Sequence, residues 1–142
     1  MKTNMLFAKR IYALLSIVLL FSLSSYAQKM VFHNTGVAPA AEAKVRIKHT
    51  KNKNYSINLK VVHLAPASNL NPPKKTYVAW MITESNGTKN IGQFRSKSGL
   101  ISKALKGSIK TVTPFKPTGF FITAEDDGAI AEPGDHVILK TN

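Results

Sequence analysis

Two segments in the first half of the chain alternate apolar and polar side chains: residues 43–49 read AKVRIKH, and residues 55–61 read YSINLKV. Successive side chains of a β-strand point to opposite faces, so each segment has one apolar face and one polar or basic face. The intervening residues 50–54, TKNKN, have the composition of a turn. The pattern therefore predicts a β-hairpin with one face on a hydrophobic core and the other in water.

Further β-forming segments follow the hairpin at short intervals, at residues 76–83, 90–95, 118–125 and 136–140. The first of them, TYVAWMIT, is apolar almost throughout, as expected of a central strand, and we expect Trp80 to be a core residue. Asn86-Gly87 is a strong hairpin turn signal between the first two segments. Short strands separated by turn sequences are typical of an all-β fold, and we predict an immunoglobulin-like antiparallel β-sandwich of about seven strands.

Two stretches carry a weaker pattern. Residues 28–42 contain one short apolar run and then small residues, which predicts either a flexible leader or a short strand. Residues 96–110 combine isolated apolar residues with Gly107, and we expect an irregular segment with one short strand there. The sandwich domain is accordingly assigned to residues 43–142.

The first 27 residues have the three parts of a secretory signal peptide. Lys2, Lys9 and Arg10 provide a positive start, residues 11–23 are uncharged and apolar, and Ala27 completes a small-x-small cleavage pattern. The apolar run is shorter than the roughly 20 residues of a bilayer-spanning helix. We therefore expect a signal helix that is cleaved after Ala27, and a periplasmic or secreted protein; if uncleaved, this segment would be the membrane contact.

Cysteine is absent from the chain, which excludes disulfides, thiolate metal ligands and cysteine nucleophiles. Beyond residue 27, 17 basic residues stand against 7 acidic ones, a formal net charge of +10. Such a charge attracts anions such as lipid headgroups or acidic glycans, but it is also compatible with an ordinary soluble surface. Nucleic acid is not an expected partner of an exported domain.

The predicted hairpin gathers four basic side chains on its outward face: Lys44, Arg46, Lys48 and Lys60. Lysine on an edge strand prevents edge-to-edge aggregation, and this protective interpretation is favoured. The alternative is an anion-binding face, because like charges held close together on a sheet are otherwise unfavourable.

Five of the seven acidic residues lie between positions 125 and 135. Glu125, Asp126 and Asp127 are a possible calcium loop, although their spacing does not follow the EF-hand pattern. A solvated loop whose carboxylates pair with nearby lysines is the preferred interpretation.

No motif in the sequence indicates catalysis or a cofactor. A Gly-x-Ser-x-Gly nucleophile turn, a His-Glu-x-x-His zinc motif and a phosphate-binding glycine loop are all missing from the sequence. Histidine and methionine could form a thiolate-free copper site, but the spacing of the candidate ligands does not indicate one. Those candidates are His33, His49, His63, His136, Met30 and Met81. We therefore expect no enzyme, no metal and no cofactor.

Several short motifs occur in a recognisable order. Residues 77–80 read YVAW, residues 90–94 read NIGQF, residues 121–125 read FITAE, and Pro133-Gly134 precedes the last apolar run. In this order they resemble the extracytoplasmic C-terminal domain of the anti-sigma-K factor family. The resemblance implies an immunoglobulin-like sandwich outside the cytoplasm.

The chain also departs from that family. Only ten residues precede the apolar run, so a sigma-binding domain is not expected, and Asp126-Asp127-Gly128 stands where the family commonly has a proline and a glycine pair. The leading hypothesis is an exported, non-enzymatic binding module of the cell envelope, whose partner is an anionic ligand or an envelope protein. The alternative, following the resemblance, is a regulatory or sensor partner of a membrane signalling protein, and an enzyme with an unrecognised site comes third.

Overall fold

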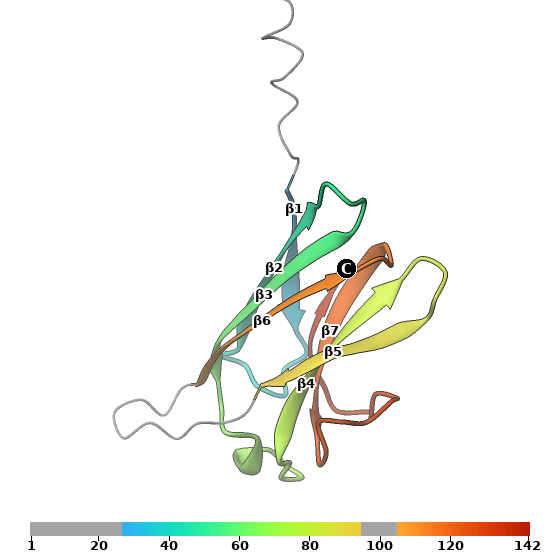
Figure 1. Ribbon diagram of the computed structural model, residues 1–142. Coiled ribbons are helices and arrows are strands. Elements are labelled where there is room, and N and C mark those ends of the chain that lie inside the picture. Colours follow the sequence, from blue (N-terminus) through green and yellow to red (C-terminus); the bar gives the residue numbers. More distant parts are fainter. Residues whose placement is uncertain (1–26, 95–104) are drawn as a thin grey trace, which may run out of the picture.

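The computed structural model describes residues 27–94 and 105–142, and the expected signal helix lies outside them (Figure 1). The described residues form eight β-strands and one short 3-10 helix, η1 (Ala67–Asn69). The strands are β1 (Gln28–Asn34), β2 (Glu42–His49), β3 (Tyr55–Leu64), β4 (Thr76–Thr83), β5 (Thr88–Phe94), β6 (Leu105–Thr113), β7 (Pro117–Glu125) and β8 (Val137–Thr141).

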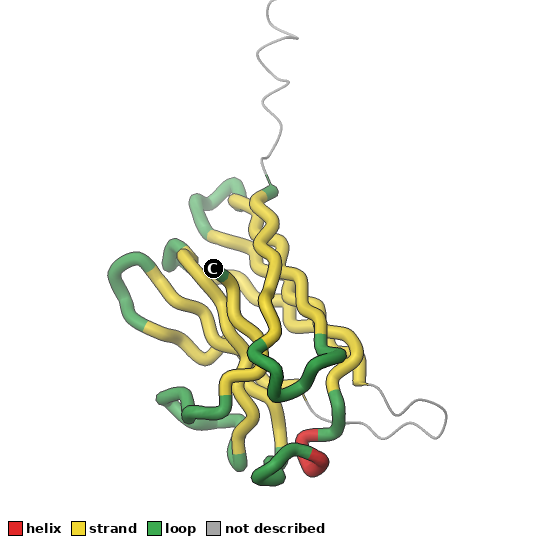
Figure 2. The backbone as a smooth tube through the Cα atoms, turned by 180° about the vertical axis from the view of Figure 1, so that it is seen from behind, coloured by secondary structure: helices red, strands yellow, loops and turns green. Residues whose placement is uncertain are grey.

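All eight strands are antiparallel to their neighbours and follow one another in the order β5-β4-β7-β8-β1-β2-β3-β6. The sheet folds over into two facing layers and is nearly barrel-shaped (Figure 2). We call β1, β2, β3 and β6 the β2 layer, and β5, β4, β7 and β8 the β4 layer. Strand β1 joins the two, since Lys29 lies opposite Arg46 of β2 and His33 lies opposite Lys140 of β8. This confirms the predicted all-β antiparallel sandwich, with eight strands instead of about seven.

The hairpin predicted at residues 43–61 is present as β2 and β3. Val45 lies opposite Leu59 and Ile47 opposite Ile57, and all four side chains are buried between the layers. A backbone hydrogen bond of 2.8 Å from Thr50 to Asn54 closes the turn. The period-two pattern was sufficient to predict this hairpin because one of its faces is buried and the other is exposed to solvent.

The two weakly patterned stretches also contain strands. Residues 28–34 form strand β1, which is the short-strand alternative predicted for residues 28–42. Residues 105–113 form the nine-residue strand β6, which pairs along β3, whereas the rest of the stretch expected to be irregular lies outside the described residues. Pairing with β3 explains the difference, because a polar-rich segment such as LKGSIKTVT becomes a strand when a neighbouring strand satisfies its backbone.

The main core lies between the two layers and is made of aliphatic and aromatic side chains from both. Tyr77 is fully buried in it, and its hydroxyl donates a 2.9 Å hydrogen bond to the carbonyl of Ala65. Burial raises the pKa of Tyr77 to about 12. The phenol therefore serves as a neutral anchor for the β3–β4 connection.

Trp80 is buried as expected, but it faces away from the main core. Its β4 neighbours Ala79 and Met81 belong to the core between the layers, so alternation turns Trp80 to the outer side of the β4 layer. There its ring stacks on Phe121 with centroids 6.1 Å apart, and its Nε1 donates a 2.8 Å hydrogen bond to Thr123. This cluster is a second, smaller hydrophobic core.

The loop between β7 and β8 covers the outer face of the β4 layer, on which Trp80 lies. Asn90 lies opposite Trp80 in the sheet, and its Nδ2 donates to the carbonyls of Gly128 and Ile130 at 3.1 and 3.0 Å. The side-chain amide of β5 thus holds the loop against the outer face of the β4 layer. This explains why β4 is buried on both faces although it belongs to a two-layered sandwich.

Replacing Gly107 with alanine should destabilise the seam where β5 approaches β6. An added Cβ would collide with the ring of Phe94, a buried β5 residue. Overpacking of this kind costs about 1–3 kcal/mol, to be measured as a lower midpoint of urea unfolding. The neighbouring residue Ser108 faces outward, so Ser108→Ala should change the free energy of unfolding by less than about 0.5 kcal/mol. Equal midpoints for both variants would contradict the close contact between β5 and β6.

Candidate functional site

The structure brings the four predicted basic side chains together on the outer surface of the β2 layer. Lys44 lies directly opposite Lys60, and Arg46 and Lys48 follow on β2 with side chains exposed on the same face. Residues two apart on a strand are about 6.7 Å apart and neighbouring strands about 4.8 Å apart, so these charges are close neighbours. The hairpin prediction placed all four correctly relative to one another.

Two further cations join this surface from strands that the sequence assigned only weakly. Lys29 of β1 lies opposite Arg46, and Lys110 of β6 lies opposite Asn58 of β3. One row across the four strands β1, β2, β3 and β6 therefore consists of Lys29, Arg46, Asn58 and Lys110. We define the basic face as Lys29, Lys44, Arg46, Lys48, Lys60 and Lys110. Lys29 and Lys110 could have been found from the sequence only if β1 and β6 had been recognised as strands that flank the hairpin.

No residue of the basic face takes part in an ion pair in the described part of the chain. The two ion pairs found there join Lys74 to Asp126 and Lys116 to Glu84, both away from this face. Glu42 is exposed at the start of β2, two residues before Lys44, and forms neither of these pairs. The outer surface of the β2 layer consequently presents concentrated positive charge to solvent.

Two shallow depressions mark the basic face, with volumes of about 190 and 260 Å³. Arg46 and Asn58 line both of them. Of the other cations of the basic face, Lys29, Lys44 and Lys60 line the smaller depression, and Lys48 and Lys110 line the larger one. The two depressions thus lie on either side of the Arg46–Asn58 pair and follow the direction of β2 and β3.

Asn58 has an unusual environment for a side chain on an outer face. Its Oδ1 is buried, and no donor among the described residues forms a hydrogen bond to it. A buried acceptor without a partner costs about 1–3 kcal/mol. Such groups are uncommon and are often found where a ligand or water completes the hydrogen bond.

The three carboxylates of the possible calcium loop each have a different hydrogen-bond partner. Glu125 is buried and accepts a 2.8 Å hydrogen bond from the backbone of Gly134. Asp127 accepts one of 3.0 Å from the backbone of Ala129. Asp126 pairs with Lys74 at 2.8 Å, and this hydrogen bond lowers the pKa of the carboxyl and raises that of the lysine. The structure therefore does not point these side chains at one common position.

The histidines lie on separate elements: His33 on β1, His49 at the end of β2, His63 on β3 and His136 before β8. Among the residues that the structure describes, no three His, Cys, Asp or Glu side chains gather closely enough to hold a metal ion.

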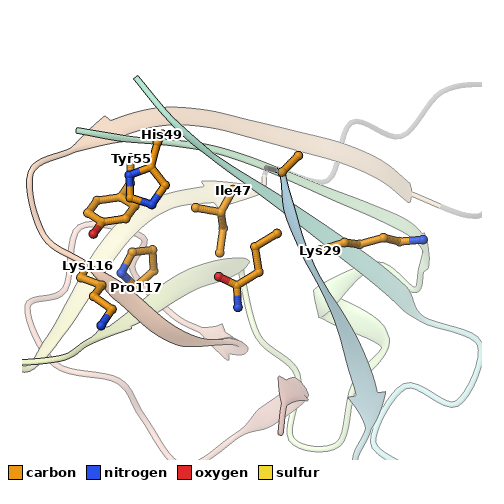
Figure 3. Close-up of a pocket in the computed structure, with 8 residues that line it drawn as sticks. Lys29, Ile47, His49, Tyr55, Lys116 and Pro117 are labelled. Carbon is orange, nitrogen blue, oxygen red and sulfur yellow. The ribbon is translucent and has the colours of Figure 1, made fainter. Parts of the chain in front are cut away.

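A pocket of about 490 Å³ opens at the end of the sandwich where β1 begins (Figure 3). Its wall includes Ile47, the tilted ring pair of His49 and Tyr55 with centroids 4.5 Å apart, and Pro117. Lys116 also lines it, but its ammonium already pairs with Glu84 at 2.7 Å. The sequence did not indicate this pocket, because its walls come from three distant parts of the chain. Only Lys29 among its lining residues belongs to the basic face, which carries six cations outside the two ion pairs of the described residues and is the stronger candidate site.

Comparisons of the chain with family models, with curated proteins and with solved structures found no match. In the two described segments, no helix has the length and apolar character needed to cross a bilayer.

Proposed function

We propose that this protein is an exported, non-enzymatic binding module of the cell envelope that holds a polyanion against its basic face. The supporting observation is the set of six exposed cations on four adjacent strands, none of which takes part in the ion pairs of the described residues. Holding like charges opposite one another, as with Lys44 and Lys60, destabilises a sheet. A bound anion converts this repulsion into attraction.

The internal position of the hairpin strands argues against edge protection as the reason for these four cations. Lysine protects a sheet from aggregation when it lies on an edge strand. Both hairpin strands are internal, since β2 lies between β1 and β3, and β3 lies between β2 and β6. Edge protection therefore gives no reason for Lys44, Arg46, Lys48 and Lys60 to be basic.

A dissolved anionic polymer suits this face better than a lipid bilayer does. Membrane-surface binding by a folded face combines positive charge with large apolar side chains such as Trp, Phe or Leu that enter the headgroup region. The exposed large apolar residues beside the basic face are the valines Val31 and Val112. The depressions beside Arg46 instead offer concave surface for groups that project from a polymer chain.

Binding of dextran sulfate, with neutral dextran as the control, tests this proposal. We expect dextran sulfate to bind at low salt and its affinity to fall more than about tenfold between about 50 and about 200 mM salt, because polyanions release counterions when they bind cations. Neutral dextran should not bind. Failure to bind dextran sulfate at low salt would overturn the proposal, as would binding only to vesicles that contain phosphatidylglycerol.

A further inference from the structure

The central position of the basic face is held by a neutral amide instead of a seventh cation. Asn58 lies in the row between Arg46 of β2 and Lys110 of β6, and the next row of the face pairs Lys44 with Lys60. A lysine or arginine at this position would have extended the charge without interruption. The structure instead places a hydrogen-bonding group in the middle of the cations.

The free atom of that amide is an acceptor. Asn58 Oδ1 is buried and has no hydrogen-bond partner in the described residues, although two long cationic side chains flank it in its row. An acceptor is complemented by a hydroxyl or an N–H and is repelled by a carboxylate, sulfate or phosphate oxygen. The anionic groups that the cations attract therefore leave this atom unsatisfied.

The two depressions show how one ligand can offer anionic groups to the cations and a hydrogen-bond donor to Asn58. One lies beside Lys44 and Lys60, the other beside Lys48 and Lys110, and Asn58 belongs to both. Lys44 and Lys48 are four residues apart on β2, which is about 13 Å in an extended strand. A chain lying along β2 and β3 can thus reach cations on both sides while its middle part passes over the amide.

Resting on the proposed polyanion binding, we infer that the ligand is an acidic polysaccharide, with anionic groups in the two depressions and a hydroxyl donated to Asn58 Oδ1. Because this oxygen is inaccessible in the free protein, the flanking side chains of Arg46 and Lys110 move aside when the hydroxyl binds. An ammonium group could also donate to this atom, but the six surrounding cations repel it. A sugar ring carries neutral donors and an anionic substituent on the same unit. Polyanions without such donors can satisfy the cations but not the amide.

Two carboxylate polymers separate this inference from simple charge attraction. Polygalacturonate carries hydroxyls beside its carboxylates, whereas polyacrylate carries carboxylates alone. At equal carboxylate concentration we expect the protein to bind polygalacturonate about tenfold more tightly, the size of one hydrogen bond to an otherwise unsatisfied buried group. In Asn58→Val the preference should vanish, with polyacrylate binding unchanged.

A matched control and a stability measurement complete the test. Ser108→Val, an exposed outward-facing β6 residue opposite Lys60, adds the same side chain beyond the two depressions and should keep the preference. Asn58→Val should melt at the same or a higher temperature than the parent protein, because it removes an unsatisfied acceptor and suits a strand. A large fall in melting temperature would contradict the unsatisfied state of the amide.

The outcomes distinguish recognition of a polysaccharide from binding of any polyanion. If both polymers bind equally, or if Asn58→Val retains the preference, the polysaccharide inference is wrong and polyanion binding stands. If neither polymer nor dextran sulfate binds at low salt, the proposed function itself is wrong.

Discussion

Reversing Lys44, Arg46 and Lys48 to glutamate together is expected to abolish detectable binding of dextran sulfate. The three side chains lie on the exposed face of β2, and the change converts three attractive charges into three repulsive ones. Each charge of the ligand within a Debye length, about 10 Å at 0.1 M salt, experiences this reversal. We expect a loss of at least about a hundredfold in affinity at low salt, measured by titration calorimetry or surface binding.

The same change of net charge elsewhere provides the control. Lys51, Lys89 and Lys140 are exposed and do not belong to the basic face, and their joint reversal to glutamate alters the total charge equally. This variant should lose only a small part of the affinity. Comparable losses in both variants would show that overall charge, and not the basic face, attracts the polymer. Circular dichroism should show an unchanged β-sheet spectrum for both.

Replacement of Trp80 by alanine is expected to be the most destabilising single substitution considered for this fold. The indole is completely buried on the outer side of β4, stacks on Phe121 and donates a hydrogen bond to Thr123. Truncating a buried aromatic to alanine costs about 3–5 kcal/mol, a large part of the 5–15 kcal/mol that separates a typical folded domain from its unfolded chain. The lower free energy of unfolding is measured by urea unfolding, followed through the circular dichroism of the β-sheet because this signal does not require the indole.

Two further variants locate the source of this effect. Trp80→Phe keeps a buried ring and removes the donor to Thr123, so its cost should be much smaller than that of alanine. Ile82→Ala changes the next outward residue of β4, which is 41% exposed, and should cost little. If Trp80→Ala melts like the parent protein, the second hydrophobic core on the outer side of the β4 layer does not exist as described.

Which parts of the fold could be predicted depended on how the burial of each strand is divided between its two faces. In β2 and β3 one face is buried and the other is exposed, so alternation identified both strands, their register and the four clustered cations. In β4 both faces are buried, and its apolar sequence could not reveal that Trp80 and Met81 belong to different cores. In β6 the polar residues that pair with β3 concealed a strand of full length.

The candidate site shows the same division between sequence and structure. Local alternation was enough to place Lys44, Arg46, Lys48 and Lys60 on one outward face, because neighbours in a hairpin are also neighbours in sequence. The tertiary structure alone brought Lys29 and Lys110 beside them, buried the amide oxygen of Asn58 and made both hairpin strands internal. These features depend on which distant strands pair, and a side-chain pattern with period two carries the face of each residue but not the identity of its neighbouring strand.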